Sequence, residues 1–293
     1  MVCSDPGFRR AAITALHCAV VDVMFSAGDA YDRFMGRWSR ELAPLLVQFV
    51  GVRDGDRVLD VGSGTGSLAS VVAAAAPSSV VVGVDPSPPY VAFAQAHRGG
   101  ARVRFEVGDA QALAFADHSF DVTLSSLILN FIPRADAALE EMMRVTRSGG
   151  IVAAAVWDYD DGMEMLRVFW DQAVALHPAI ALRDERHMPF SRHGELAALW
   201  RQHGMREVTD EPLTIATRFA SFDDYWSPFL DRQGPAGAYV ASLSDEDRER
   251  LRASLQHRLI DERPAGRKGP PYNSDDREIV LTARAWAVRG VVA

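Results

Sequence analysis

Short apolar runs alternate with helical patterns between residues 57 and 157. Five runs have the length and the composition of buried strands, at 57–63, 79–85, 102–109, 120–127 and 151–157. Three intervening stretches have helical character and end at proline or glycine, at 67–76, 90–98 and 135–147. Strands that alternate with helices predict right-handed crossovers and a mostly parallel sheet that helices cover on both faces.

This alternation stops after residue 157, where a long helical region begins. Two later stretches, 205–220 and 277–290, predict a sixth and a seventh strand. Between them, 243–259 predicts a helix, because Ser244 stands where an N-cap is expected and Asp247 follows three positions later.

The net charge, the cysteines and the length of the apolar runs limit the classes of function that the chain can have. The chain has 293 residues and a net charge of -8, from 31 basic and 39 acidic side chains. Proteins that bind duplex nucleic acid usually present a basic face, so this charge disfavours that class, although it does not exclude a local basic groove. Cys3 and Cys18 have no metal or redox spacing, and no apolar run is long enough for a membrane span. We expect a cytoplasmic protein, monomeric or homodimeric, with residues 1–30 as an N-terminal extension.

The most informative segment is the glycine-rich turn after the first predicted strand. It reads D-x-G-x-G-x-G from Asp60 to Gly66, and it opens a helix whose free N–H groups suit an anionic ligand group. A phosphate-binding P-loop would need Lys and then Ser or Thr after the last glycine, but Ser67 and Leu68 follow. A dinucleotide site would place its third glycine at position 67, which disfavours NAD or FAD.

The D-x-G-x-G-x-G pattern resembles the first motif of class I S-adenosylmethionine (SAM) methyltransferases. Other features stand in register with it, since Asp85 ends the second predicted strand and Asp109 ends the third. Phe120-Asp121 then opens the fourth strand, and RVTRSGG precedes the fifth. The resemblance covers about residues 30 to 160. It is closest to a subgroup that includes quinone-biosynthesis C-methyltransferases and many small-molecule enzymes.

The resemblance implies a Rossmann-like α/β fold with a seven-stranded, mostly parallel sheet whose last strand is antiparallel. It implies one methyltransferase domain over 31–293, with a SAM-binding core at about 45–160. Helical insertions at about 160–204 and 221–275 would form a lid, or cap.

The resemblance also implies where the cofactor lies. The amino-acid end of SAM would meet the glycine loop, its ribose Asp85, and its adenine Asp109. The residues expected to bind SAM are Tyr31, Arg37, Asp60, Gly62, Ser63, Gly64, Gly66, Asp85, Pro86, Asp109, Ala110, Ser125 and Ser126. Tyr31 also fits a plain core stripe with Phe34 and Trp38, and this alternative stays open.

Methyl transfer needs a general base only if the acceptor must lose a proton. Asp158, just after the fifth strand, and His187 and His193, in the first insertion, are the candidates. The histidines of this region match no zinc spacing, so no metal is expected, and solvated or structural histidines are the plainer interpretation.

The leading hypothesis is a SAM-dependent methyltransferase that acts on a small molecule. The insertions are rich in aromatic residues, which would suit an aromatic or apolar acceptor if they were not simply the core of the cap. A SAM-binding regulatory or partner protein without catalysis is the alternative, and a nucleic-acid methylase or an NAD-dependent oxidoreductase is less favoured. The stretches SSLILNFIPR and VWDYDDG depart from the quinone-methylating enzymes, so quinone specificity is not supported.

One motif points toward nucleic acid. Ser87-Pro88-Pro89-Tyr90 resembles the catalytic loop of enzymes that methylate base amino groups, but in those enzymes the loop follows the fourth strand. Here it follows the second strand, where Ser87 can N-cap a helix and Pro88 suits its first position. We therefore interpret it as a helix start.

Overall fold

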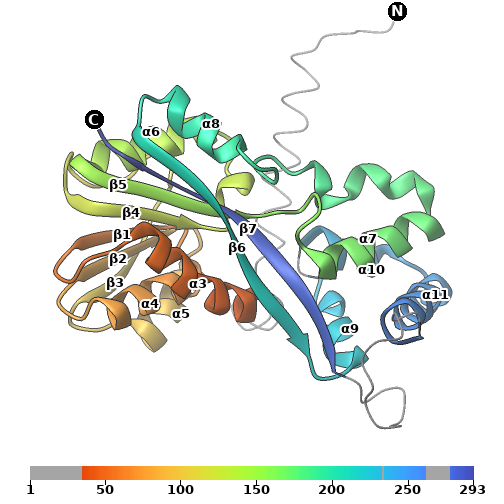
Figure 1. Cartoon of the computed structure of the whole chain (residues 1–293). Coiled ribbons are helices and arrows are strands. Elements are labelled where there is room, and N and C mark those ends of the chain that lie inside the picture. Colours follow the sequence, from red (N-terminus) through yellow and green to blue (C-terminus); the bar gives the residue numbers. More distant parts are fainter. Residues whose placement is uncertain (1–34, 233, 262–277) are drawn as a thin grey trace, which may run out of the picture.

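The structure is a computed structural model that describes residues 35–232, 234–261 and 278–293. Its centre is one sheet of seven strands in the order β3-β2-β1-β4-β5-β7-β6 (Figure 1). The strands are β1 Arg57–Val61, β2 Val80–Asp85, β3 Val103–Val107, β4 Phe120–Ser126, β5 Thr146–Trp157, β6 Arg206–Phe219 and β7 Ile279–Val291. The pairs among β1 to β5 are parallel, and β7 runs antiparallel to both β5 and β6. This confirms the predicted mostly parallel sheet with an antiparallel last strand.

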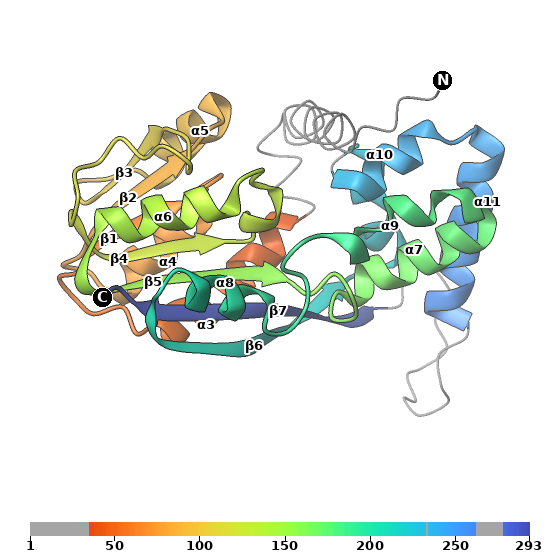
Figure 2. The same ribbon diagram turned by 90° about the horizontal axis from the view of Figure 1, so that it is seen from above.

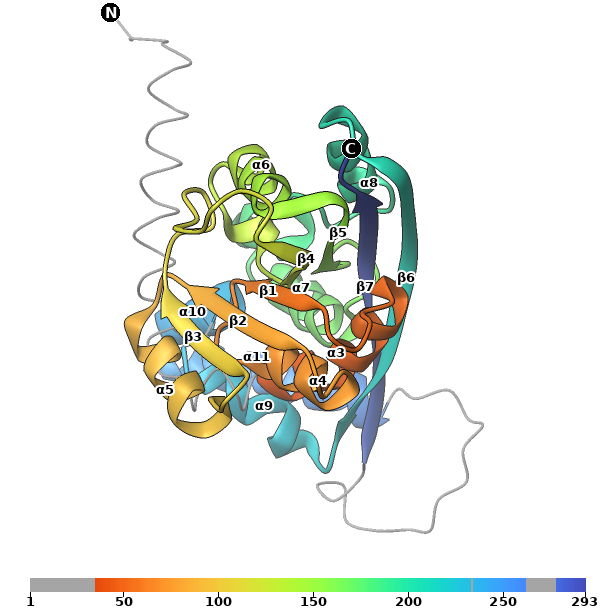
Figure 3. The same cartoon turned by 90° about the vertical axis from the view of Figure 1, so that its left-hand side faces the viewer.

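Helices cover both faces of the sheet, as Figure 3 shows. Helices α3 Arg37–Val50, α4 Ser67–Ala75 and α5 Pro88–Arg98 lie on one face. Helices α6 Ala135–Val145 and α8 Glu195–Gln202 lie on the other. Strands that are covered on both sides need apolar residues at nearly every position, which explains the continuous runs seen in the sequence.

The boundary between α6 and β5 differs from the sequence prediction. The helix was expected to continue to residue 147 and the strand to begin at 151, but β5 begins at Thr146. The Thr146 hydroxyl donates to the Met142 carbonyl at 2.7 Å and lies 2.6 Å from the Thr123 hydroxyl of β4. These bonds join the end of the helix directly to the sheet. The helix therefore ends before Gly149 and Gly150, which belong to β5.

Four helices form a cap beside the sheet (Figure 2). They are α7 Glu164–Leu176, α9 Phe222–Leu230, α10 Gly234–Ser242 and α11 Asp245–Gln256, with short turns η3 Pro178–Arg183, η4 Glu185–His187 and η5 His257–Asp261. The arrowheads of β4 and β5 point toward this cap, so the carboxyl ends of these strands face it (Figure 2). The Ser244 hydroxyl accepts from the Asp247 N–H at 3.1 Å, which confirms the predicted N-cap of α11.

Helix α8, which falls in the first expected insertion, lies on the sheet instead. Its Trp200 indole donates to the Val152 carbonyl of β5 at 3.0 Å, and Trp200 is fully buried. The helices of this insertion that lie in the cap are therefore α7 and the turns η3 and η4.

Aromatic side chains make up the core of the cap. The ring of Phe169 stacks on Phe229 with centroids 4.5 Å apart and meets Trp170 edge-on at 5.3 Å. The buried Tyr225 ring packs against Phe229, and its hydroxyl donates to the Met165 carbonyl at 2.9 Å. These residues bind one another, so their abundance in the sequence reflects packing.

No helix in the described part of the chain is both long and apolar enough to cross a membrane.

Removing one of these rings should destabilise the protein. Phe169→Ala deletes a fully buried ring and should lower the free energy of unfolding by about 3–5 kcal/mol. Leu182, which is 89% exposed, provides the control, because Leu182→Ala should change that free energy by less than about 0.5 kcal/mol. Denaturant unfolding of both variants measures the difference. Equal small effects would show that the aromatic cluster does not hold the cap.

Candidate functional site

The glycine loop between β1 and α4 is built from backbone bonds. The N–H groups of Gly62 and Ser63 both donate to the Val84 carbonyl of β2, at 2.7 and 3.0 Å. The Gly66 N–H then donates to the Ser63 carbonyl at 2.7 Å, and α4 begins at the next residue. The loop is therefore fastened to the end of β2, with the helix start directly behind it.

Two of its glycines are required by close neighbours. A Cβ at Gly62 would lie 2.4 Å from Ile128 Cγ1, and one at Gly66 would lie 2.7 Å from Phe105 Cζ. Gly64 is different, because a Cβ there would meet no atom within 4 Å. All three have positive φ, at 75°, 85° and 51° for Gly62, Gly66 and Gly64. Gly64 is half-buried, and the open space beside it lets a ligand approach its backbone.

Asp85, at the end of β2, links this loop to the next one. One carboxylate oxygen accepts from the Gly64 N–H and the other from the Ser87 N–H, both at 2.9 Å. Burial raises the pKa of this carboxyl, while the two N–H groups favour its charged form. Each oxygen can accept a second bond, which leaves capacity for two ligand hydroxyls.

Asp60 lies beneath the loop. Its carboxylate accepts from the Ala69 N–H of α4 at 3.1 Å, and it is almost fully buried. Burial, with a smaller contribution from the nearby Asp85 carboxyl, raises its pKa to about 7. With its side chain enclosed, Asp60 holds the helix start against the strand.

The other predicted cofactor residues lie along the same edge of the sheet or near it. Ser125 pairs in register with Val61, which brings the ends of β4 and β1 together, and Ser126 follows it. Asp109 lies just beyond β3, where its carboxylate accepts from the Gln111 N–H at 2.9 Å. Pro86 is exposed and Ala110 is buried. The hydroxyls of Ser63 and Ser125 are buried without a hydrogen-bond partner among the described residues.

Arg37 joins the core to the cap. Its guanidinium donates to both carboxylate oxygens of Asp224 in α9, at 2.9 and 3.2 Å, and stacks over the rings of Trp38 and Phe219. A direct role for Arg37 in SAM binding stays a prediction. Tyr31 lies outside the described residues.

The three candidate bases lie in three separate segments. Asp158, just after β5, is buried, and it accepts from Arg284 at 2.6 Å and from the Asp161 N–H at 3.0 Å. His193, before α8, is largely exposed and lies 3.0 Å from an Asp210 carboxylate oxygen. Their catalytic roles stay predictions, and the contacts of Asp158 account for its burial without one.

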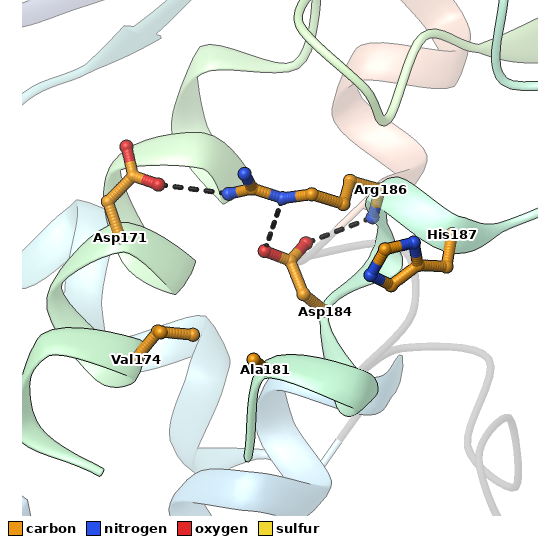
Figure 4. Close-up of a pocket in the computed structure, with 6 residues that line it drawn as sticks. All are labelled: Asp171, Val174, Ala181, Asp184, Arg186 and His187. Carbon is orange, nitrogen blue, oxygen red and sulfur yellow. Dashed lines mark hydrogen bonds and ion pairs between the residues drawn. The ribbon is translucent and has the colours of Figure 1, made fainter. Parts of the chain in front are cut away.

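His187 lines a cavity of about 310 Å³ in the cap (Figure 4). There the Arg186 guanidinium lies between two carboxylates, 2.7 Å from Asp184 and 3.0 Å from Asp171. Arg167 also pairs with Asp184 at 2.6 Å, and together these charges keep the pKa of Asp184 low despite its burial. The charged groups of this cavity are thus paired with one another. In the described ranges no group of three or more His, Cys, Asp or Glu side chains could hold a metal.

Sequence reasoning missed Phe105 of β3. A Cβ at Gly83 would lie 2.4 Å from its ring, and Gly66 also touches it, so the ring fills the space under the loop. The signal was available, since a glycine inside the apolar run VVVGVD marks a close approach by another group.

Comparison with known proteins identifies the domain. A family model described as a methyltransferase domain matches residues 59–154, from the middle of β1 through most of β5. These residues form a SAM-dependent methyltransferase domain. SAM is the methyl donor of such domains, and the glycine loop and Asp85 both fall within the matched part.

Two relatives match over part of the chain. An uncharacterized protein of Mycobacterium tuberculosis is 32% identical over 54% of this chain and 56% of its own length. The demethylmenaquinone methyltransferase of Renibacterium salmoninarum is 36% identical over 50% of this chain and 59% of its own length. The chain thus spans about half the length of these curated relatives.

A solved structure shows the same fold. The structure of a methyltransferase from Bacillus halodurans, itself assigned only by inference, superposes with a TM-score of 0.54 at 18% identity. It covers 85% of this chain and 97% of its own. This likeness supports the Rossmann-like methyltransferase architecture.

The buried carboxyl of Asp60 predicts a pH dependence of stability. Its folded pKa of about 7 lies above the ordinary value of 3.8, so the folded protein holds the proton more tightly than the unfolded chain. The stabilisation is fully present below pH 4 and is lost as the pH rises toward 7. Asp60→Asn mimics the protonated group and should be more stable than the parent above pH 7, by roughly 3–4 kcal/mol, with the gap closing toward pH 4. Denaturant unfolding without ligand at several pH values tests this. A gap that does not change with pH would contradict the buried position of Asp60.

Proposed function

We propose that this chain transfers a methyl group from SAM to a small-molecule acceptor. The observation that carries the proposal is the open backbone at Gly64 beside the buried Asp85 carboxylate, at the edge where β1, β2 and β4 end. Ligands of open α/β sheets bind at this edge, where the strand order reverses between β1 and β4.

The residues at this edge fit the parts of SAM. The free N–H groups at the start of α4 suit its carboxylate, and Asp85 has acceptor capacity for two ribose hydroxyls. Asp109 and Ala110, on the next loop along the edge, are the candidates for the adenine, and Ser125 and Ser126 for the region near the sulfur.

Bound SAM supplies a methyl group that a cationic sulfur has already activated. The protein must then bind SAM and the acceptor, align the acceptor with that methyl group, and exclude water. The cap lies at the carboxyl ends of β4 and β5, and the Arg37–Asp224 ion pair ties it to α3 (Figure 1). This position suits it to cover the acceptor.

We propose that the acceptor is an aromatic or apolar molecule. The Renibacterium relative is named for demethylmenaquinone, which would fit an aromatic or apolar acceptor. The cap's aromatic residues do not add support, because Phe169, Tyr225 and Phe229 are fully buried against one another.

We further propose that the enzyme is a soluble protein of the cytoplasm, monomeric or homodimeric, and that it does not act on nucleic acid.

Changes at the loop and at Asp85 should abolish cofactor binding and leave the fold intact. Gly64→Val places a side chain in the open space and strains a residue with positive φ, and Asp85→Ala removes the ribose partner. Asp85→Ala should weaken SAM binding at least about 100-fold, as expected for the loss of two hydrogen bonds to a charged group, and Gly64→Val should weaken it by a similar factor because its side chain blocks the ligand. Gly100→Val is the control, since Gly100 also has open space but lies beyond α5. Calorimetric titration with SAM measures the affinities, and circular dichroism checks the fold.

The same titrations separate the alternatives. Unchanged affinity in both variants would show that the cofactor site lies elsewhere, and binding of NAD in place of SAM would indicate an oxidoreductase. SAM binding without S-adenosylhomocysteine production on a broad panel of acceptors would favour a non-catalytic SAM-binding protein.

A further inference from the structure

The chain makes a strained turn where β4 ends. Leu127 has a φ of 65°, a left-handed conformation that is uncommon for a leucine, and its N–H donates to the Ala155 carbonyl of β5 at 2.7 Å. Strain of this kind in a well-packed protein gathers at functional sites. The next residue, Ile128, fills the space left by the missing Cβ of Gly62. The short turn η2 Leu129–Phe131 therefore begins directly against the glycine loop.

Asn130, in the middle of η2, is buried although its side-chain amide makes no hydrogen bond to the described residues. Its side chain is 3% exposed, and neither its amide nitrogen nor its amide oxygen has a hydrogen-bond partner among the described residues. Among the described residues, Asn130 is the one side chain with two buried polar atoms that lack a hydrogen-bond partner. The buried carboxylates near this edge, Asp60 and Asp85, are bonded, while the hydroxyls of Ser63 and Ser125 are not. A leucine, which has the same branched shape, would avoid the cost of an unpaired amide, so folding alone does not explain this residue.

We propose that the Asn130 amide binds the methyl acceptor, and that the acceptor presents a hydroxyl or an amine as the atom to be methylated. This inference rests on the proposed function. An amide side chain offers one acceptor and two donor hydrogens, and a hydroxyl or an amine can bond to both kinds of atom. A carbon nucleophile can bond to neither.

The amide is neutral at physiological pH, so it orients the acceptor and takes no proton from it. By accepting the hydroxyl or amine hydrogen, its oxygen directs a lone pair of the acceptor away from itself. That lone pair forms the bond to the methyl carbon, and the carbon–sulfur bond breaks with its electrons staying on sulfur. The proton of the hydroxyl or amine passes to water. Asn130 is thus an acceptor-binding residue that selects oxygen or nitrogen over carbon.

Asn130→Leu is the central test, because it removes both polar atoms and keeps the branched shape of the side chain. Without ligand, the variant should melt roughly 2–4 °C higher than the parent, since an unpaired buried amide is gone. Its affinity for S-adenosylhomocysteine should not change. With methyl-radiolabelled SAM and a deproteinised small-molecule extract of the source cells, its rate of product labelling should fall about 10- to 100-fold.

Thr217→Val is the matched control. Thr217 is fully buried in β6 and its hydroxyl also lacks a partner among the described residues, but β6 is three strands away from β4. This variant should also be stabilised, and its labelling rate should equal that of the parent. Mass spectrometry and NMR of the labelled product identify the methylated atom.

Each outcome decides the inference. A lower melting temperature for Asn130→Leu would show that the amide has a partner within the protein, and would overturn the proposal. Labelling at the parent rate, or a methyl group on carbon, would overturn it as well. If the parent protein binds no S-adenosylhomocysteine, the proposed function itself fails, and this is distinguishable because it is measured on the parent alone.

Discussion

The carboxylate of Asp85 holds together the two loops on which the site depends. It accepts one N–H from Gly64 after β1 and one from Ser87 after β2. This interaction fixes the glycine loop over the end of the sheet and keeps a buried acidic group beside open backbone. Burial raises the pKa of the group, so its two N–H partners are what favour the charge that ribose hydroxyls would meet. The rest of the edge is arranged around this point, with Asp60 below it and the end of β4 alongside.

Much of the fold could be predicted from the sequence, because strands buried on both faces leave a clear mark. The glycine-rich loop was also predictable, because close neighbours at Gly62 and Gly66 leave no room for a side chain. The SPPY motif was correctly interpreted as the start of α5, although the Ser87 hydroxyl makes no capping bond and the Ser87 N–H is held by Asp85 instead. The start of β5 was predicted too late, because the bond between the Thr146 and Thr123 hydroxyls, which ties this residue to β4, joins residues far apart in sequence.

The cap was less predictable, since its residues serve tertiary contacts that leave no periodic pattern. Aromatic abundance suggested a ligand surface, but the rings of Phe169 and Phe229 stack on each other. Helix α8 was grouped with the cap and lies on the sheet. The partners of Arg37 and Asp158, which are Asp224 and Arg284, are more than a hundred residues away from them. Such pairings cannot be obtained from spacing along the chain.

The proposed function requires SAM to bind where β1, β2 and β4 end, with Asp85 on the ribose. A crystal structure of the protein with S-adenosylhomocysteine tests it most directly. Both ribose hydroxyls should lie within hydrogen-bond distance of the Asp85 carboxylate, and the ligand should pass over Gly64. Density for the ligand at any other place, such as the cap cavity beside His187, would contradict it.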